Sequence, residues 1–368
     1  MIRHALITNV LLFSSLICAP LLAKDSAELP TVKIFVLSGF EVGDYTDDAP
    51  GEFQFWAERL ILDKTLDVAG APHKIVYNDN GVYGSPCSKP SDANLTTVAC
   101  SELIMSLLLD SRLDFTNTYW LVNGIAGIDP KSGSIGSAVW SADIIDGDAL
   151  RELGELDRPN DWSYGLYAIG VNKPGLAPLK NADAGGWGGA KLNYTMRYHL
   201  NKSLTEWAYQ ISNQAVTLKD SKALTDFRAQ YSTFAAAMQP PRILVGASLG
   251  TARYWHGQQL TQWARDWITL WTDGEARFAT TAMEQAVIMG VLDRMSKRGF
   301  LDFNRVMMVR GVSNYSMPPL NTEIIESAGD ESLGSVPAFE AQYQAGAAVI
   351  KELLKNWQQY AENTPKFN

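Results

Sequence analysis

The sequence predicts an α/β protein with a mostly parallel sheet, and three observations support this fold class. Short apolar, β-branched runs alternate with longer segments of helical periodicity, an order typical of strands joined by crossover helices. The 368 residues are 46% hydrophobic, so the chain can bury a sizeable core. No internal repeat and no Pro- or Ser-rich linker is visible, so we expect one domain over residues 24–368.

The individual elements follow from these patterns. We expect strands at Val32–Ser38, His73–Tyr77, Thr118–Val122, Ser137–Ala142, Gly165–Gly170, Ile243–Ala247 and Arg305–Val312. We expect helices at Glu52–Leu66, Ser101–Leu109, Thr195–Ile211, Thr251–Trp271, Thr281–Lys297 and Ala338–Trp357. Because such sheets bind ligands beyond the carboxyl ends of their strands, a site is expected in the loops after Ser38, Val122, Ala247 and Val312. The Gly-rich segment from Gly175 to Tyr194 reads as a surface excursion or a lid.

Residues 1–23 have the pattern of a secretory signal peptide. Arg3 and His4 precede an apolar stretch from Ala5 to Leu22, and polar sequence begins after Ala23. The alternative is a membrane anchor, but polar residues and Pro20 interrupt a run that would need about 20 apolar residues to span a bilayer. We expect an exported protein, periplasmic or secreted, without a membrane span.

The net charge and the cysteine content restrict the classes of binding partner that we expect. The net charge of −9 argues against nucleic acid or an anionic membrane surface. Loss of Cys18 with the signal leaves Cys87 and Cys100, which we expect to pair in an oxidising compartment, two free thiols being the alternative. No cysteine or histidine pair has metal-site spacing, so we expect no metal and no other cofactor.

The loop after the first predicted strand is acidic. Six acids lie between Glu41 and Glu58 in "EVGDYTDDAPGEFQFWAE", and Glu52 opens a helix. Glu41 and Glu52 are candidate site residues. The structural alternative for Glu52 is a carboxylate in a helix's first turn. The aspartates between them are solvated loop residues or ligands of a hard cation.

The stretch "TNTYWLVNGIAGIDP" predicts a strand that ends at Asn123 and Gly124, where a small-residue loop can bring backbone close to a ligand. No Arg or Lys lies between Arg112 and Lys131. A phosphate without a cationic partner is costly to desolvate. We therefore expect a loop built for water and sugar rather than phosphate, unless a distant residue such as Arg253 folds in.

The stretch "RILVGASLGTARYWHG" contains a G-x-S-x-G pattern from Gly246 to Gly250, and Gly246 and Ser248 are candidate substrate-binding residues. A Ser-Asp-His hydrolase is disfavoured, because His256 is the only histidine after Ser248 and no acid lies between them. The following helix carries tryptophans at a four-residue spacing, Trp263, Trp267 and Trp271, which indicates a core face.

Two later segments complete the set. In "TTAMEQA", Thr281 and Glu284 have the spacing of a capping box. In "RVMMVRGVSNYS", a predicted strand ends before Asn314, which on its own would fit an Asx turn.

The order of these segments resembles the purine nucleoside permease family, which is similar in turn to nucleoside phosphorylases and nucleosidases. The strongest parts are "NGIAGIDP" followed by "GSAV…DIIDGD", and "AMEQA" followed by "VRGVSNY". The resemblance extends from about Val32 to Trp357. It implies a three-layer α/β/α, nucleoside-phosphorylase-like fold with a mixed, barrel-like sheet, and a purine nucleoside site at the strand ends.

The resemblance also implies roles. Glu284, beside Met283, falls where relatives bind the ribose hydroxyls, and Glu52, with Glu41 as the competing candidate, falls where nucleosidases activate water. Asn314 falls where nucleosidases and hexameric phosphorylases place an Asp that protonates the purine. An amide can donate a hydrogen bond but cannot deliver a proton, although trimeric phosphorylases use Asn in a comparable role.

Two functions remain open from the sequence. One is an exported enzyme that cleaves the N-glycosidic bond of purine nucleosides, as a hydrolase rather than a phosphorylase. The other is a nucleoside-binding protein that supports uptake through a membrane transporter. A storage or scaffold protein that keeps only the fold is a third alternative. The base and the oligomeric state, including a homo-oligomer, are undetermined by the sequence.

Overall fold

The computed structural model describes residues 28–90, 97–177, 195–320, 322–327 and 332–366. The predicted signal peptide and most of the Gly175–Tyr194 segment lie outside these residues. Across the described residues, no helix is both long enough and apolar enough to cross a bilayer.

The centre of the fold is a mixed sheet of 12 strands, with a separate two-stranded hairpin. The sheet contains β1 (Ile34–Phe40), β2 (Lys64–Leu66), β3 (Ile75–Tyr77), β4 (Val82–Ser88), β5 (Tyr119–Ile128), β6 (Ala138–Trp140), β7 (Asp143–Asp146), β10 (Arg197–His199), β11 (Ile243–Val245), β12 (Ala247–Gly250), β13 (Phe278–Ala282) and β14 (Val306–Tyr315). The hairpin is β8 (Leu150–Glu152) and β9 (Leu166–Ala168). The main path runs β10-β7-β12-β13-β5-β1-β4-β3-β2, and β14, β6 and β11 branch from β5. The sheet is not a closed barrel.

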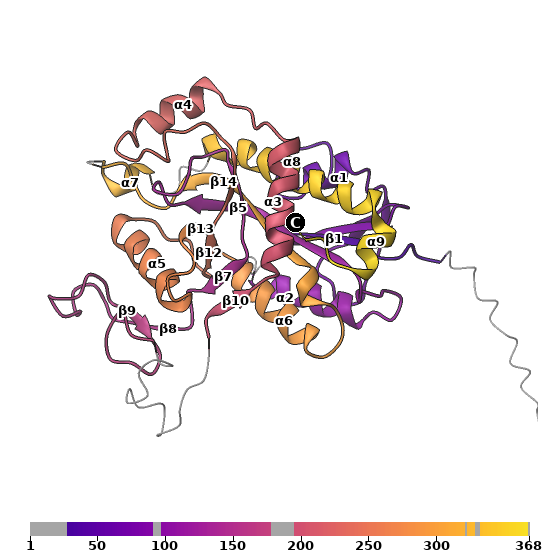
Figure 1. The fold of residues 1–368 in the computed structure, drawn as a ribbon, viewed down its shortest axis with the longest axis horizontal. Helices are drawn as coiled ribbons and strands as arrows, with labels where there is room; N and C mark the ends of the chain where they lie inside the picture. The colour runs from indigo at the N-terminus through magenta and orange to yellow at the C-terminus, as the bar shows by residue number, and fades with distance from the viewer. Residues whose placement is uncertain (1–27, 91–96, 178–194, 321, 328–331, 367–368) are drawn as a thin grey trace, which may run out of the picture.

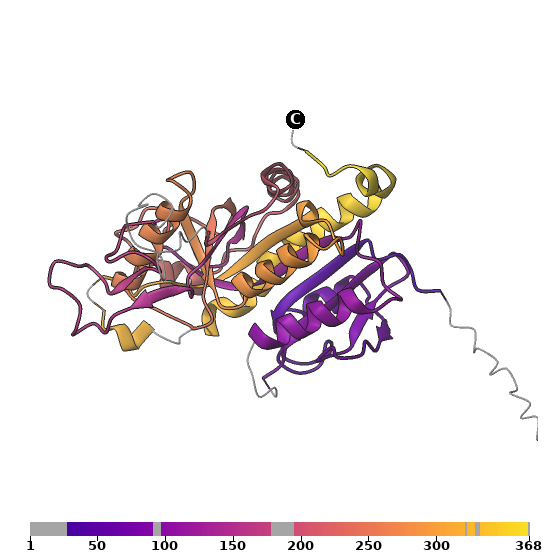
Figure 2. The ribbon, with the colours of Figure 1, turned by 90° about the horizontal axis from the view of Figure 1, so that it is seen from below.

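Helices cover both faces of this sheet (Figures 1 and 2). They are α1 (Gln54–Arg59), α2 (Thr97–Leu109), α3 (Lys202–Ala215), α4 (Lys222–Ala229), α5 (Gln258–Trp271), α6 (Gln285–Ser296), α7 (Ile324–Ser327), α8 (Ser332–Lys355) and α9 (Trp357–Glu362). Together with the sheet they make the predicted α/β fold.

Strand alternation explains the layers, because successive side chains of a strand point to opposite faces. Phe35 and Leu37 of β1 pack in the core beneath α2 and α6, together with Trp120 of β5. Ile34 and Val36 pack in the opposite core, beneath α1, α3 and α8. The central strands are therefore apolar on both faces, as expected of strands buried between two helical layers.

A further core lies under α5, beside β7 and β12. Trp263, Trp267 and Trp271 are buried in it, which confirms the core face predicted from their spacing. The hairpin β8–β9 packs against the same core and projects at one end of the molecule (Figure 1).

The largest differences from the sequence predictions are strands that run further than expected. β5 continues through Asn123 and Gly124 to Ile128, β12 (Ala247–Gly250) contains all of the G-x-S-x-G segment except Gly246, and β14 includes Asn314. The predicted loops at these places are therefore wrong. The small residues permit extended backbone as readily as a turn, and pairing with neighbouring strands decides between them.

Other elements were predicted at the wrong length or missed. Residues 52–66 form the short helix α1 and then β2, and Thr281 lies in β13, so the predicted capping box is absent and Glu284 itself is the N-cap of α6 without a side-chain cap bond. The strands β4, β7 and β13 were missed because they have only four to seven residues, and β4 and β7 also contain Gly, Pro or Asp.

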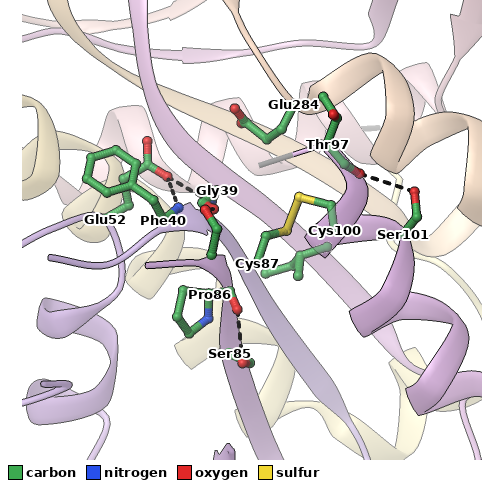
Figure 3. The surroundings of a disulfide bond; sticks show 12 residues. Gly39, Phe40, Glu52, Ser85, Pro86, Cys87, Thr97, Cys100, Ser101 and Glu284 are labelled. Atoms are coloured by element: carbon green, nitrogen blue, oxygen red, sulfur yellow. Dashed lines mark hydrogen bonds between the residues drawn. A yellow bond between two sulfur atoms is a disulfide. The ribbon is translucent and has the colours of Figure 1, made fainter. Parts of the chain in front are cut away.

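Cys87 and Cys100 form a disulfide, the pairing predicted from the sequence. It joins the end of β4 to the first turns of α2, and both cysteines are buried. Figure 3 shows the disulfide next to Gly39 and Phe40, at the end of β1. The bond therefore fixes α2 to the edge of the sheet where β1 ends.

Replacing both cysteines by serine should lower the free energy of unfolding by about 3 kcal/mol, since the disulfide closes a loop with a sequence separation of 13 residues. Urea unfolding of the double variant beside the oxidised parent measures this. Equal stability of the two proteins would contradict a structural role for the bond.

Candidate functional site

The candidate site lies where β5 changes its neighbour. The first half of β5 pairs in parallel with β1, up to Ser38 opposite Asn123. Its end pairs antiparallel with β13, from Gly127 onward. Between these two pairings, the segment from Gly124 to Ala126 pairs with neither β1 nor β13. Its backbone on this side is therefore open to side chains and ligands.

Glu52 occupies the split between β1 and β5. Its Oε2 accepts hydrogen bonds from the amides of Gly39 (2.8 Å) and Phe40 (3.0 Å), and its Oε1 accepts one from the amide of Ile125 (2.6 Å). Figure 3 shows the first two bonds. The carboxylate thus replaces the missing strand pairing, and three backbone donors that would otherwise be unpaired are satisfied.

A cavity of about 130 Å³ opens beside this carboxylate. The ends of β1, β5, β13 and β14 line it, together with the segment before α5. Its polar lining consists of Glu52, Glu284, Arg253, Thr281, Ser313 and Asn314. Its apolar lining consists of Phe40, Ile125, Ala126, Gly127, Tyr254, Trp255, Ala282 and Met283. Two carboxylates, an amide and three aromatic rings therefore share one small cavity.

A buried cation balances the two carboxylates. Nη1 of Arg310 lies 2.5 Å from Oε1 of Glu284, and Nε of Arg310 donates to Oε1 of Gln285 at 3.1 Å. Arg310 is fully buried, and its Nη2 has no hydrogen-bond partner among the described residues. Gln285 in turn bonds Ser248, whose hydroxyl also contacts Thr280. The charge of Glu284 is fixed in place by this network.

Glycine at position 124 makes the arrangement possible. Arg310 of β14 lies opposite Gly124 of β5. A Cβ atom on Gly124 would lie 2.3 Å from Nη1 of Arg310 and 2.8 Å from both carboxylate oxygens of Glu52. Only a residue without a side chain leaves room here for the guanidinium of Arg310 and the carboxylate of Glu52.

Burial is the main cause that raises the pKa of Glu52 from 4.5 to about 8. The charge of Glu284 raises it further, whereas Arg310 and the backbone amides of Ile125 and Phe40 lower it. A carboxyl with a pKa in this range changes its protonation state near neutral pH. That property suits a general base or acid.

Asn314 is held in a defined orientation at the other end of the cavity. Its Oδ1 accepts a hydrogen bond from the hydroxyl of Ser313 at 3.0 Å, and its Nδ2 donates to the carbonyl of Tyr315 at 3.2 Å. An amide nitrogen carries two hydrogens, so one N–H remains to be donated to a ligand. The side chain is 9% exposed.

The structure brings together part of the predicted site. Glu52, Glu284, Met283 and Asn314 all line the cavity, and Gly124 lies directly behind it. Arg253, which the sequence offered as a distant cation, also lines the cavity. Nη1 of Arg253 lies 3.7 Å from Oδ1 of Asp148.

Other predicted residues have structural positions outside the cavity. Oδ1 of Asn123 accepts bonds from Ser38 and Trp56, which ties β5 to β1 and α1. Ser248 is buried in β12 rather than at an exposed turn. Gly246 allows close packing, because a Cβ there would lie 2.4 Å from Cβ of Ala279.

Glu41, the alternative to Glu52, organises its own loop. Its carboxylate accepts bonds from the amides of Val42, Gly51, Phe53 and Gln54. Burial raises its pKa although these donors act to lower it. All four donors are local backbone amides, so Glu41 fixes the start of α1 and thereby the position of Glu52.

Arg310 is the site residue that the sequence analysis missed. The signal was present, because a charged residue stands in the middle of "RVMMVRGVSNY", an otherwise apolar strand. A buried charge in a strand needs a partner of opposite charge. The sequence does not show which of its 40 acids provides that partner.

Comparison with known proteins gives the family. The sequence profile of the purine nucleoside permease family matches residues 31–365, and the chain belongs to this family. The purine nucleoside permease of Candida albicans strain SC5314 is 26% identical over 269 residues, which are 72% of this chain and 63% of that protein. A probable purine nucleoside permease of Schizosaccharomyces pombe is 27% identical over 263 residues, 69% of this chain and 72% of that protein. The chain thus spans less than two thirds of the Candida protein.

Solved structures give the fold. The 5′-methylthioadenosine/S-adenosylhomocysteine nucleosidase of Helicobacter pylori has a TM-score of 0.51 at 12% identity, covering 88% of this chain and 100% of that chain. The futalosine hydrolase of the same organism has a TM-score of 0.50 at 10% identity, covering 88% and 99%. At this identity the likeness concerns the fold, which agrees with the predicted nucleoside-phosphorylase-like architecture.

Gly124→Ala should destabilise the protein by about 1–3 kcal/mol through overpacking against Arg310 and Glu52. Urea unfolding measures the loss. Gly299→Ala is the matched control, because Gly299 also has a positive φ (85°) but no heavy atom within 4 Å of an added Cβ. A loss at position 124 no larger than that at position 299 would contradict the steric argument.

Stability should depend on pH through Glu52. The folded protein retains a proton that the unfolded chain releases between pH 4.5 and about 8, so this contribution is complete below 4.5 and is lost as the pH rises through about 8. Glu52→Gln should flatten the fall in unfolding free energy over this interval, measured by urea unfolding at several pH values. Glu340→Gln, at a surface ion pair with Arg59, should keep the parent's slope. Identical slopes in all three proteins would contradict the raised pKa.

Proposed function

We propose that this member of the purine nucleoside permease family binds purine nucleosides in the cavity beside Glu52 and hydrolyses their N-glycosidic bond. The observation that carries the proposal is the convergence of two buried carboxylates, Glu52 and Glu284, on either side of Arg310. The names of the relatives and the nucleosidase-like fold support the same ligand class.

Glu284 is proposed to bind the ribose. A carboxylate can accept hydrogen bonds from two neighbouring hydroxyl groups at once. Its ion pair with Arg310 fixes the position of this carboxylate at the cavity wall. Met283 beside it offers an apolar contact to the sugar carbons.

Glu52 is proposed to activate water. The water oxygen forms a bond to the anomeric carbon, and the bond from that carbon to the purine nitrogen breaks with both electrons going to the base. The water proton passes to the Glu52 carboxylate, and the products are ribose and free purine. A pKa of about 8 places this acceptor near a neutral working pH. The unpartnered Nη2 of Arg310 is a donor suited to the oxygen of such a water.

Asn314 is proposed to hold the departing base. Its remaining N–H can donate to the purine N7, which stabilises negative charge on the base as the bond breaks. The proton that completes the free purine comes from solvent, because an amide has none to give.

Hydrolysis is favoured over phosphorolysis by the charges in the cavity. Arg310 is already paired with Glu284, and Glu52 also faces it. A phosphate dianion in this position would compete with Glu284 for the one buried cation and would lie beside Glu52, so its desolvation would be poorly compensated. Arg253 near the cavity does not change this balance, since Asp148 lies beside it.

A second candidate is a nucleoside-binding protein that delivers its ligand to a membrane transporter. Asn314 is the specific observation in its favour, because an amide replaces the proton donor. In both cases we propose that the chain is exported. The predicted signal and the Cys87–Cys100 disulfide support export.

The test is to incubate the protein with inosine, adenosine or guanosine, with and without phosphate, and to separate the products by chromatography. We expect free base and ribose, independent of phosphate. Glu284→Gln should lose this activity, and Glu340→Gln, which removes an Arg-paired carboxylate outside the cavity, should retain it. Ribose 1-phosphate formed only with phosphate would overturn the hydrolase.

Asn314→Asp separates the enzyme from the binder. A carboxylic acid at this position supplies the missing proton, and general-acid catalysis is worth about 10²–10⁴-fold. In the enzyme, the variant should accelerate an activity that the parent already has. Saturable binding by calorimetry without turnover in the parent would instead support the binder.

A further inference from the structure

A second cavity lies next to Asn314. It has a volume of about 210 Å³, and Asn314 lines both it and the site cavity. The other walls come from the end of α4, the segment before α5 and the segment after β14. We call this second cavity the annex.

The floor of the annex is aromatic. The rings of Tyr231 and Tyr315 lie 3.9 Å apart between centroids, and Phe227 stacks on Tyr315 with an interplanar angle of 13°. The hydroxyl of Tyr231 donates to the carbonyl of Met317, and that of Tyr315 donates to the carbonyl of Ala237. Both hydroxyls are therefore occupied within the protein, and burial raises the pKa of each tyrosine so that both stay neutral. Each tyrosine is only 1% exposed, and the small part that reaches the annex is ring carbon rather than a free hydroxyl.

Polar groups line the remainder of the annex. Nε2 of His256 and the hydroxyl of Ser327 lie 2.8 Å apart, which connects the segment before α5 to α7. Burial lowers the pKa of His256, so no positive charge is favoured there. Gln230 is exposed and also lines the annex. An aromatic floor with neutral polar groups beside it fits a flat or apolar group better than an ion.

The small volume of the site cavity also favours a ligand that extends into the annex. Pockets for small molecules commonly measure about 300–1,000 Å³, whereas the site cavity alone is about 130 Å³. The two cavities together reach the lower end of that range. A ligand that used only the site cavity would leave the larger, aromatic space empty.

The position of Asn314 tells which part of a nucleoside would reach the annex. In the proposed function, on which this inference rests, Asn314 donates to N7 of the purine. The exocyclic group on C6 lies on the same edge of the purine as N7, so a substituent on that group projects past the amide. We propose that the annex receives an apolar or aromatic substituent on the 6-amino nitrogen, so that the substrate class includes N6-substituted adenine nucleosides.

The test compares adenosine with N6-benzyladenosine. Affinity is measured by calorimetry, or the ratio of kcat/KM values is used if both are turned over. The benzyl ring should be buried against Tyr231 and Tyr315, and we expect N6-benzyladenosine to be preferred by about tenfold or more. A preference for adenosine by about tenfold or more would overturn the inference.

Gln230→Trp blocks the annex from its exposed side. It should abolish the preference for N6-benzyladenosine and leave adenosine within about twofold of the parent. Gln239→Trp is the matched control, since Gln239 is also exposed but lines neither cavity. Unchanged discrimination in Gln230→Trp would overturn the assignment to the annex. Failure of the parent to bind either nucleoside would instead overturn the proposed function, and with it this inference.

Discussion

The hydrogen bonds of Glu52 to two different strands are the constraint on which the site depends. β1 and β5 separate after Ser38 and Asn123, and two strands that diverge leave amides without partners. One carboxylate satisfies the amides of Gly39, Phe40 and Ile125. The backbone of Glu52 is fixed as well, because its amide donates to the carbonyl of Phe40 and its carbonyl accepts from Gln342 of α8. The hydrogen-bond acceptors of the side chain at position 52 therefore stabilise the split in the sheet.

The same carboxylate determines the charge balance around it. Burial disfavours its ionised form, and the neighbouring Glu284 disfavours it further. Arg310 lowers the pKa of Glu52 and so opposes both effects. Its guanidinium can lie this close to Glu52 because Gly124 has no side chain between them. A glycine, an arginine and two acids, from four separate parts of the sequence, are thus coupled. Changing Glu284, Arg310 or Gly124 should therefore change the pKa of Glu52.

The sequence allowed the fold class, the two helical layers and several site residues to be predicted, but not the strand lengths. A continuous apolar run predicted β1, helical periodicity predicted α8, and the Trp spacing of α5 identified its buried face. The ends of β5, β12 and β14 could not be placed, because "NGIAGI", "ASLG" and "VSNY" are compatible with turns until neighbouring strands pair with them. Propensity is local, whereas these strands are decided by contacts between distant segments.

The residues of the candidate site differ in the same way, because some are predictable from local sequence and others depend on contacts between distant strands. Glu284 and Asn314 were found through a family pattern that is local in sequence. Arg310 was missed although it stands four residues before Asn314, since its role depends on a pairing with Gly124 that only the sheet register shows. Asn123 and Ser248 were expected at the ends of strands and prove to be buried supports. A polar residue that follows an apolar run can serve either purpose, and the local pattern does not distinguish them.

The two ends of the cavity differ in how much of the proposed chemistry they retain. At the end proposed to hold the sugar, Glu284 is paired with Arg310 and Glu52 has a raised pKa. A protein that only binds nucleosides would need Glu284 but not Glu52. At the base end, Ser313 and Tyr315 hold the Asn314 amide so that it donates a hydrogen bond but no proton. Bond cleavage would then depend more on how well the base carries negative charge when it leaves. Selection among bases would follow from the electronic character of the base as well as from its shape, and the annex beyond Asn314 would act on shape alone.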